Sequence, residues 1–71
     1  MKRTEYLERL RIRLIEVPVE ERQTWSVQEF VEWWLHEQKK DKALRWDDEP
    51  DNSFIHVRGA CRDLIGPEAG A

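Results

Sequence analysis

The chain has 71 residues and a net charge of −3, because 12 lysines and arginines stand against 15 aspartates and glutamates. This balance argues against a dedicated nucleic-acid-binding protein, whose affinity depends on neutralising phosphates, and the length allows one domain at most. The single cysteine excludes an intrachain disulfide, so we expect self-association or burial against a partner to help stabilise so small a core.

The first segment, residues 4–17, has the periodicity of an amphipathic helix. Its apolar stripe is about 100° wide and contains Tyr6, Leu7, Leu10, Leu14 and Val17. Ile12 and Ile15 lie outside this stripe, and residues 10–14 also alternate like a strand with one buried face. The many Leu, Arg and Glu residues favour helix. We therefore predict a helix that Pro18 ends, because proline disfavours helical conformation in the residue before it.

Residues 19–24 are predicted to form a short polar connection to a second helix over residues 27–40. Ser26 and Glu29 have the spacing of a capping box. In this motif the serine oxygen accepts the N–H of Glu29, and the glutamate carboxylate accepts the N–H of Ser26. Two lysines in the last turn complement the negative end of the helix dipole.

The apolar side chains of this second helix form one stripe and leave one aromatic residue over. Trp25 and Phe30 occupy the two positions of a hydrophobic staple at the start of the helix. The stripe follows the spacing of a single buried face and contains Val27, Phe30, Val31, Trp34 and Leu35. Trp33 falls outside the stripe, so its indole needs another surface to cover it.

Residues 41–53 have no single interpretation. They could extend the second helix, form a turn, or begin a hairpin in which residues 43–46 pair with residues 54–57. An acidic loop broken by proline, residues 47–52, lies between these two runs. Its carboxylates do not match an EF-hand at the positions of the turn glycine and the bidentate glutamate, so we predict no metal site.

Residues 54–65 are predicted to form a third helix. Its apolar residues cluster within about 100° on a helical wheel and comprise Phe54, Val57, Cys61, Leu64 and Ile65. Asn52 or Ser53 can cap the start, and Gly66 followed by Pro67 is a typical stop. The thiol on this apolar face is predicted to be buried and inert.

The predicted fold is therefore mainly α. It is a compact three-helix single domain over residues 1–66, followed by a frayed tail over residues 67–71. The alternative is an α+β domain, in which a short hairpin or an N-terminal strand packs on the central helix.

No pattern in the chain predicts catalysis or a bound cofactor. There is no glycine-rich phosphate loop, and neither histidine has an evident nucleophile nearby in the sequence. The N-terminal segment lacks the apolar run of a signal peptide, and no stretch approaches the roughly 18 apolar residues that span a bilayer. An unpaired cysteine fits a reducing compartment. We expect a cytoplasmic protein that is not an enzyme and that uses no cofactor, metal or membrane.

The function predicted from these features is a non-catalytic protein–protein interaction module, acting as a small regulator or inhibitor. Tryptophan is enriched at binding hot spots, and the predicted stripes do not account for Trp33 and Trp46. We predict that these two residues, with His36 and Glu37 beside them, bury an aromatic patch on a partner protein or on a second copy in a homodimer. The other possibility is that the first helix or residues 43–53 fold over both indoles and complete the core.

A second functional interpretation comes from the arginines of the first segment. Arg9, Arg11 and Arg13 could contact phosphates in a small dimeric DNA-binding transcriptional regulator. Glutamates interleave with these arginines, which is typical of a solvated face laced with salt bridges.

Overall fold

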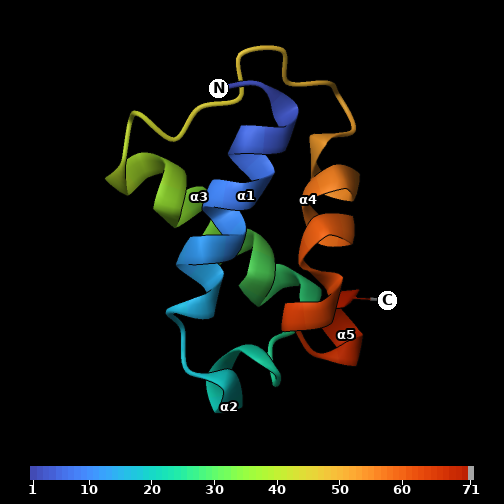
Figure 1. The fold of residues 1–71 in the computed structure, drawn as a ribbon. Coiled ribbons are helices and arrows are strands. Elements are labelled where there is room, and N and C mark those ends of the chain that lie inside the picture. Colours follow the sequence, from blue (N-terminus) through green and yellow to red (C-terminus); the bar gives the residue numbers. More distant parts are fainter. Residues whose placement is uncertain (71) are drawn as a thin grey trace.

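The computed structural model describes residues 1–70, and helices account for their regular secondary structure (Figure 1). In chain order the elements are α1 (Arg3–Ile15), α2 (Val19–Arg22), α3 (Val27–Lys40), α4 (Ser53–Cys61), the 3-10 turn η1 (Arg62–Leu64) and α5 (Pro67–Gly70). No β-strand occurs in residues 1–70. The predicted mainly α domain is confirmed, and the α+β alternative is wrong.

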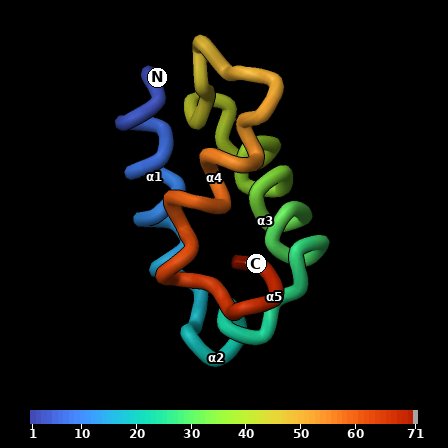
Figure 2. The backbone as a smooth tube through the Cα atoms, turned by 90° about the vertical axis from the view of Figure 1, so that its right-hand side faces the viewer, coloured from blue at the N-terminus to red at the C-terminus, as the bar shows by residue number. Residues whose placement is uncertain are grey.

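The helices pack around one core. α1 and α4 lie side by side, and α3 packs across them and contacts α5. Figure 2 shows α1 and α3 on opposite sides of the molecule, with α4 between them in this view. α2 lies at one end of the long axis, and the segment that joins α3 to α4 lies at the other end in both views. The long axis measures 31 Å.

The first helix buries the stripe that its periodicity predicts. Its buried residues are Tyr6, Leu7, Leu10 and Leu14. Ile12 and Ile15 lie outside the stripe and are 58% and 55% exposed. α1 ends two residues before the predicted boundary, and the predicted polar connection contains the helical turn α2, which has Pro18 at its N-cap. Proline suits this place because its fixed φ and missing N–H cost nothing there.

The second predicted helix has the same bounds as α3, residues 27–40. The capping box is present: the N–H of Glu29 donates to Oγ of Ser26 over 3.2 Å, and the N–H of Ser26 donates to Oε1 of Glu29 over 3.1 Å. These bonds pair two backbone donors that a helix start otherwise leaves without partners.

The buried face of α3 is rotated about the helix axis relative to the predicted stripe. Phe30, Trp34 and Glu37 are buried, whereas Leu35 is 48% exposed. At 100° per residue, the centre of the buried face lies roughly 60° from the centre of the predicted stripe, toward Trp33. The expected burial of Leu35 is therefore wrong.

Two contacts on one flank of α3 account for the rotation. Trp33 and Glu37 are spaced i, i+4 and so share this flank. The carboxylate of Glu37 accepts a hydrogen bond from Arg13 of α1 over 3.1 Å, and the ring of Trp33 lies 5.9 Å from that of Trp25, which precedes the helix. Leu35 lies on the opposite side of the helix and is left exposed.

The segment between α3 and α4 is an irregular loop that inserts two side chains into the core. Leu44 and Trp46 are only 3% and 6% exposed. The N–H of Asp47 donates to the carbonyl of Met1 over 3.0 Å, and the Met1 amine donates to the Arg45 carbonyl over 2.8 Å. These bonds hold the loop against the start of α1.

The predicted third helix is shorter than expected and is followed by further structure. α4 ends at Cys61, where the chain tightens into η1, although Ile65 remains buried as predicted. Residues 67–70 do not fray: they form α5, which packs on α3 with Ala69 fully buried. Residue 71 lies outside the described residues. Sequence periodicity could not reveal α5, because one helical turn is too short to show a repeat.

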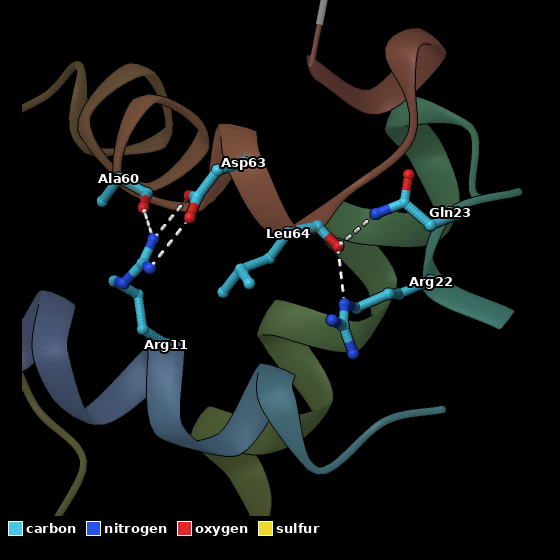
Figure 3. A network of polar contacts seen from close by, with 6 residues as sticks. All are labelled: Arg11, Arg22, Gln23, Ala60, Asp63 and Leu64. Carbon is cyan, nitrogen blue, oxygen red and sulfur yellow. Dashed lines mark hydrogen bonds and ion pairs between the residues drawn. The ribbon is translucent and has the colours of Figure 1, made fainter. Parts of the chain in front are cut away.

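Hydrogen bonds from α1 and α2 hold the end of α4 in place (Figure 3). Arg11 donates to both carboxylate oxygens of Asp63, over 2.7 and 3.0 Å, and to the carbonyl of Ala60. Nε of Arg22 and Nε2 of Gln23 donate to the carbonyl of Leu64 over 2.7 and 3.2 Å. The carbonyl groups left free at the end of α4 and in η1 thereby gain partners.

Candidate functional site

The structure separates the two tryptophans that the sequence places in one patch. Trp33 is half-buried, and its ring stacks on Phe30 with the centroids 6.0 Å apart. It also packs against Trp25, so these three rings together form the apolar cluster at the start of α3. Trp33 therefore helps to stabilise the fold and presents only part of its ring to solvent.

Trp46 is a core residue. Its ring lies 5.5 Å from that of Tyr6 and meets His56 edge-on at 5.7 Å. The loop between α3 and α4 folds back over α1 and carries Trp46 into the core. This agrees with the alternative prediction that residues 43–53 fold inward and complete the core. An exposed patch that combines Trp33 and Trp46 does not form in this chain.

The two remaining residues of the predicted patch differ in exposure. His36 is exposed on the polar side of α3, whereas Glu37 is 7% exposed. The Glu37 carboxylate is bound by Arg13 and by Nζ of Lys40, each over 3.1 Å. Burial raises the Glu37 pKa, but Lys40 and Arg13 outweigh it and bring the pKa below its ordinary value. Glu37 is thus engaged within the chain.

Two of the three arginines proposed for phosphate contact are also engaged within the chain. Both terminal nitrogens of the Arg11 guanidinium donate hydrogen bonds to the Asp63 carboxylate, and these bonds hold the pKa of Asp63 below its ordinary value. Arg13 forms ion pairs with Glu37 and Asp41. Arg9 alone is exposed and forms no ion pair with another residue of the described range. The first helix therefore does not present a row of free cations.

A depression at the C-terminal end of α3 has the properties of a binding surface. It has a volume of about 530 Å³, is open to solvent, and is lined by Leu35, Gln38, Lys39, Lys42, Leu44 and Arg45. The rotation of α3 leaves Leu35 on its floor, and the loop that follows places Leu44 beside it. We call this surface the basic depression.

The rim of the basic depression is positively charged. Lys39, Lys42 and Arg45 are exposed, and none forms an ion pair with residues 1–70. Lys40, between them in sequence, instead bridges to Glu37. On a chain of net charge −3, these three cations around two leucines form a local reversal of sign. A surface of this kind can attract the negatively charged groups of a ligand and can also bury an apolar side chain of the same ligand.

A second depression, between α1 and α3, lacks this property. Its volume is about 300 Å³, and it is lined by Arg9, Ile12, Arg13, Glu16, Glu37 and Lys40. Most of its charges pair with each other across the groove, as Arg13 and Lys40 do with Glu37. It therefore offers less unsatisfied charge to a ligand than the basic depression does.

The sequence contains a signal for the basic depression. Leu35 and Lys39 are spaced i, i+4 and so share one face of α3, and a further lysine and an arginine follow within six residues. The expectation that Leu35 is buried hides this pattern. Only the rotation of α3 shows that the leucine and the cations belong to one surface.

Residues 1–70 contain neither a cluster of metal-ligating side chains nor a membrane-spanning helix. Within residues 1–70, no three His, Cys, Asp or Glu side chains gather closely enough to hold a metal ion. No helix in this range is long and apolar enough to cross a bilayer. The buried Cys61 thiol has its pKa raised by burial to about 11, so it is protonated at neutral pH and a poor nucleophile.

Comparison of the chain with family models, with curated proteins and with solved structures finds no match in any of the three.

Proposed function

We propose that this protein is a non-catalytic interaction module, a small regulator or inhibitor that binds an acidic protein segment in the basic depression. The bound segment would present carboxylates to Lys39, Lys42 and Arg45, and an apolar side chain to Leu35 and Leu44. The observation that carries this proposal is the set of three unpaired cations around an apolar floor.

The chemistry of the depression fits a peptide better than a small molecule. Small-molecule sites enclose most of the ligand surface, whereas this depression is open. Ion pairs at an exposed rim contribute little affinity and mainly direct association and partner choice. The apolar contact with Leu35, which is 48% exposed in the free chain, would therefore supply most of the binding energy.

The geometry supports an acidic protein partner over DNA. Phosphate binding by a regulator would draw on the arginines of α1, but Arg11 and Arg13 are committed to Asp63, Glu37 and Asp41. A leucine floor adds nothing to phosphate contact, whereas it suits an apolar side chain.

The test uses three synthetic peptides and measures amide chemical shifts and binding heat. One peptide is rich in glutamate with a central leucine, the second replaces this leucine by serine, and the third replaces the glutamates by lysine. We expect the first to bind and to shift the amides of Leu35 and Leu44. The second should bind at least about tenfold more weakly, because a buried leucine contributes about 1.5–3 kcal/mol. The third should not bind.

Charge-reversal variants locate the site. Lys39→Glu with Lys42→Glu should weaken binding of the first peptide at least about tenfold, because the introduced carboxylates repel those of the peptide. The matched control, Arg9→Glu with Arg62→Glu, makes the same change of net charge at exposed residues that form no ion pair and lie away from the depression, and it should retain binding. Equal loss in both variants, or binding of a DNA duplex with the steep salt dependence of counterion release, would contradict the proposal.

A further inference from the structure

The junction of α1 and α2 carries a surface that complements the basic depression. Where α1 meets α2, Ile15 and Val19 are 55% and 47% exposed. Three carboxylates, Glu16, Glu20 and Glu21, are their neighbours in sequence; all are exposed and form no ion pair with residues 1–70. We call this surface the acidic corner. It combines exposed apolar side chains with free negative charge, which is the combination that the basic depression requires.

The two surfaces cannot meet within one chain. Figures 1 and 2 show α2, which belongs to the acidic corner, at one end of the molecule, and the segment between α3 and α4, which contributes Lys42, Leu44 and Arg45 to the basic depression, at the other. The segments that carry the two surfaces are held in one core through Leu14, Trp34 and Leu44, so they cannot move together. Contact between them therefore requires two molecules.

We propose that the acidic corner of one copy of this chain occupies the basic depression of another. In this arrangement Ile15 or Val19 contacts Leu35 and Leu44, while the glutamates face the lysine and arginine rim. This inference rests on the proposed function, and it identifies the molecule bound in the basic depression as a second copy of the chain.

The contact is head-to-tail, because the two surfaces that meet are different. Each molecule in such a pair keeps one free corner and one free depression, so further copies can add. A heterologous contact of this kind produces a ring when the rotation closes and an open chain when it does not. Self-association should therefore continue past the dimer as concentration rises.

The acidic loop at residues 47–52 is a poorer candidate for the same role. Asp47 is paired with the Met1 amine and Asp48 with Lys2, at 2.8 and 2.9 Å. The loop also joins α3 to α4, at the same end of the molecule as the basic depression. Its free carboxylates, Glu49 and Asp51, provide a matched control for those of the acidic corner.

The experiment measures mass by sedimentation over a concentration series up to about 1 mM, a range that detects millimolar dissociation constants. The wild-type chain should show a rising average mass that falls back toward the monomer at high salt, because salt screens the charged rim. The corner variant Glu20→Lys with Glu21→Lys and the depression variant Lys39→Glu with Lys42→Glu should each associate at least about tenfold more weakly.

Mixing the two variants distinguishes a head-to-tail contact from other contacts between copies of the chain. The corner variant keeps an intact depression, and the depression variant keeps an intact corner. A 1:1 mixture should therefore associate although neither variant does so alone, because an intact corner meets an intact depression. This result also shows that both variants are folded. The control variant Glu49→Lys with Asp51→Lys carries the same charge change and should associate like the wild-type chain.

Other outcomes overturn the inference. A wild-type chain that stays monomeric at about 1 mM, a mixture that does not associate, or loss of association in the Glu49 and Asp51 control each contradicts it. If the wild-type chain binds the acidic leucine peptide but remains monomeric, the head-to-tail contact is wrong and the proposed function stands. If it neither binds the peptide nor associates, both are wrong.

Discussion

The indole N–H of Trp34 donates to the hydroxyl oxygen of Tyr6 over 2.8 Å inside the core. The same hydroxyl donates its proton to Oε1 of Gln38 over 2.7 Å, so α1 and α3 are joined by a chain of two hydrogen bonds. Burial raises the pKa of Tyr6 and outweighs the opposing effect of the Trp34 N–H, so the hydroxyl stays protonated at neutral pH. This chain satisfies polar groups that the packing of the two helices would otherwise leave without water.

Replacing Tyr6 by phenylalanine should destabilise the protein by about 1–3 kcal/mol, because the buried N–H of Trp34 would lose its acceptor. Urea unfolding followed by tryptophan fluorescence measures this change. Gln38→Ala is the control. It removes the half-buried amide that accepts from the Tyr6 hydroxyl but leaves Trp34 its acceptor, so the free energy of unfolding should fall less, by about 0.5–1.5 kcal/mol. If Tyr6→Phe leaves the unfolding midpoint unchanged, the bond contributes nothing to stability.

Two glycines should respond in opposite ways to alanine. A Cβ on Gly66 would overlap the backbone carbonyl of Gln23, whereas a Cβ on Gly59 meets no heavy atom within 4 Å. Gly66→Ala forces the α2 and η1 segments apart and should cost about 1–3 kcal/mol. Gly59→Ala, inside α4, should instead stabilise by about 0.5–1 kcal/mol, because alanine favours helix. Thermal unfolding of both variants tests the pair, and the same sign for both would contradict the packing at Gly66.

Glu37 should make stability depend on acid pH. Its pKa lies below the ordinary value of 4.5 because Lys40 and Arg13 together outweigh burial. A carboxylate with a lowered pKa in the folded state contributes stability above its unfolded pKa and loses that contribution as the pH falls through the folded pKa. Glu37→Gln should therefore cost about 1.5–3 kcal/mol at neutral pH, and progressively less below about pH 4.5.

Urea unfolding at a series of pH values measures this dependence. Glu8→Gln is the control, because Glu8 is exposed and forms no ion pair with residues 1–70. A constant difference between the wild-type chain and Glu37→Gln from pH 7 to pH 3 would show that the Glu37 carboxylate does not carry the effect.

Cys61 should make stability depend on alkaline pH. Burial raises its pKa from 9.0 to about 11. The folded state therefore retains the thiol proton when the unfolded state has lost it, so the contribution is complete below pH 9 and declines between pH 9 and 11. The difference in unfolding free energy between the wild-type chain and Cys61→Ala should shrink over this interval. A difference that stays constant would show that the thiol does not titrate differently in the two states.

Local signals in the sequence predict the helices well. The capping box at Ser26 and Glu29 depends only on residues three positions apart, and its two bonds are present. The stripe of α1 depends on helical periodicity within one segment, and Tyr6, Leu10 and Leu14 are fully buried. In both cases, residues close in sequence determine the structure.

Features that depend on distant contacts were not predictable in the same way. Trp46 enters the core because the loop between α3 and α4 packs against Tyr6, forty residues earlier in the chain. The final turn α5 depends on the surface of α3 that receives it. Neither the burial of Trp46 nor the turn α5 produces a periodic pattern in its own segment, so neither could be predicted from that segment.

The sequence by itself determines that α3 is an amphipathic helix from residue 27 to residue 40, because caps and periodicity are local properties. The tertiary structure alone decides which way this helix faces. Arg13 draws Glu37 toward α1 and Trp25 covers Trp33, and the resulting rotation leaves Leu35 exposed beside Leu44. A helical wheel shows which residues share a face, but it cannot show which face the neighbouring segments cover. The candidate binding surface exists because both contacts lie on the side of α3 opposite Leu35.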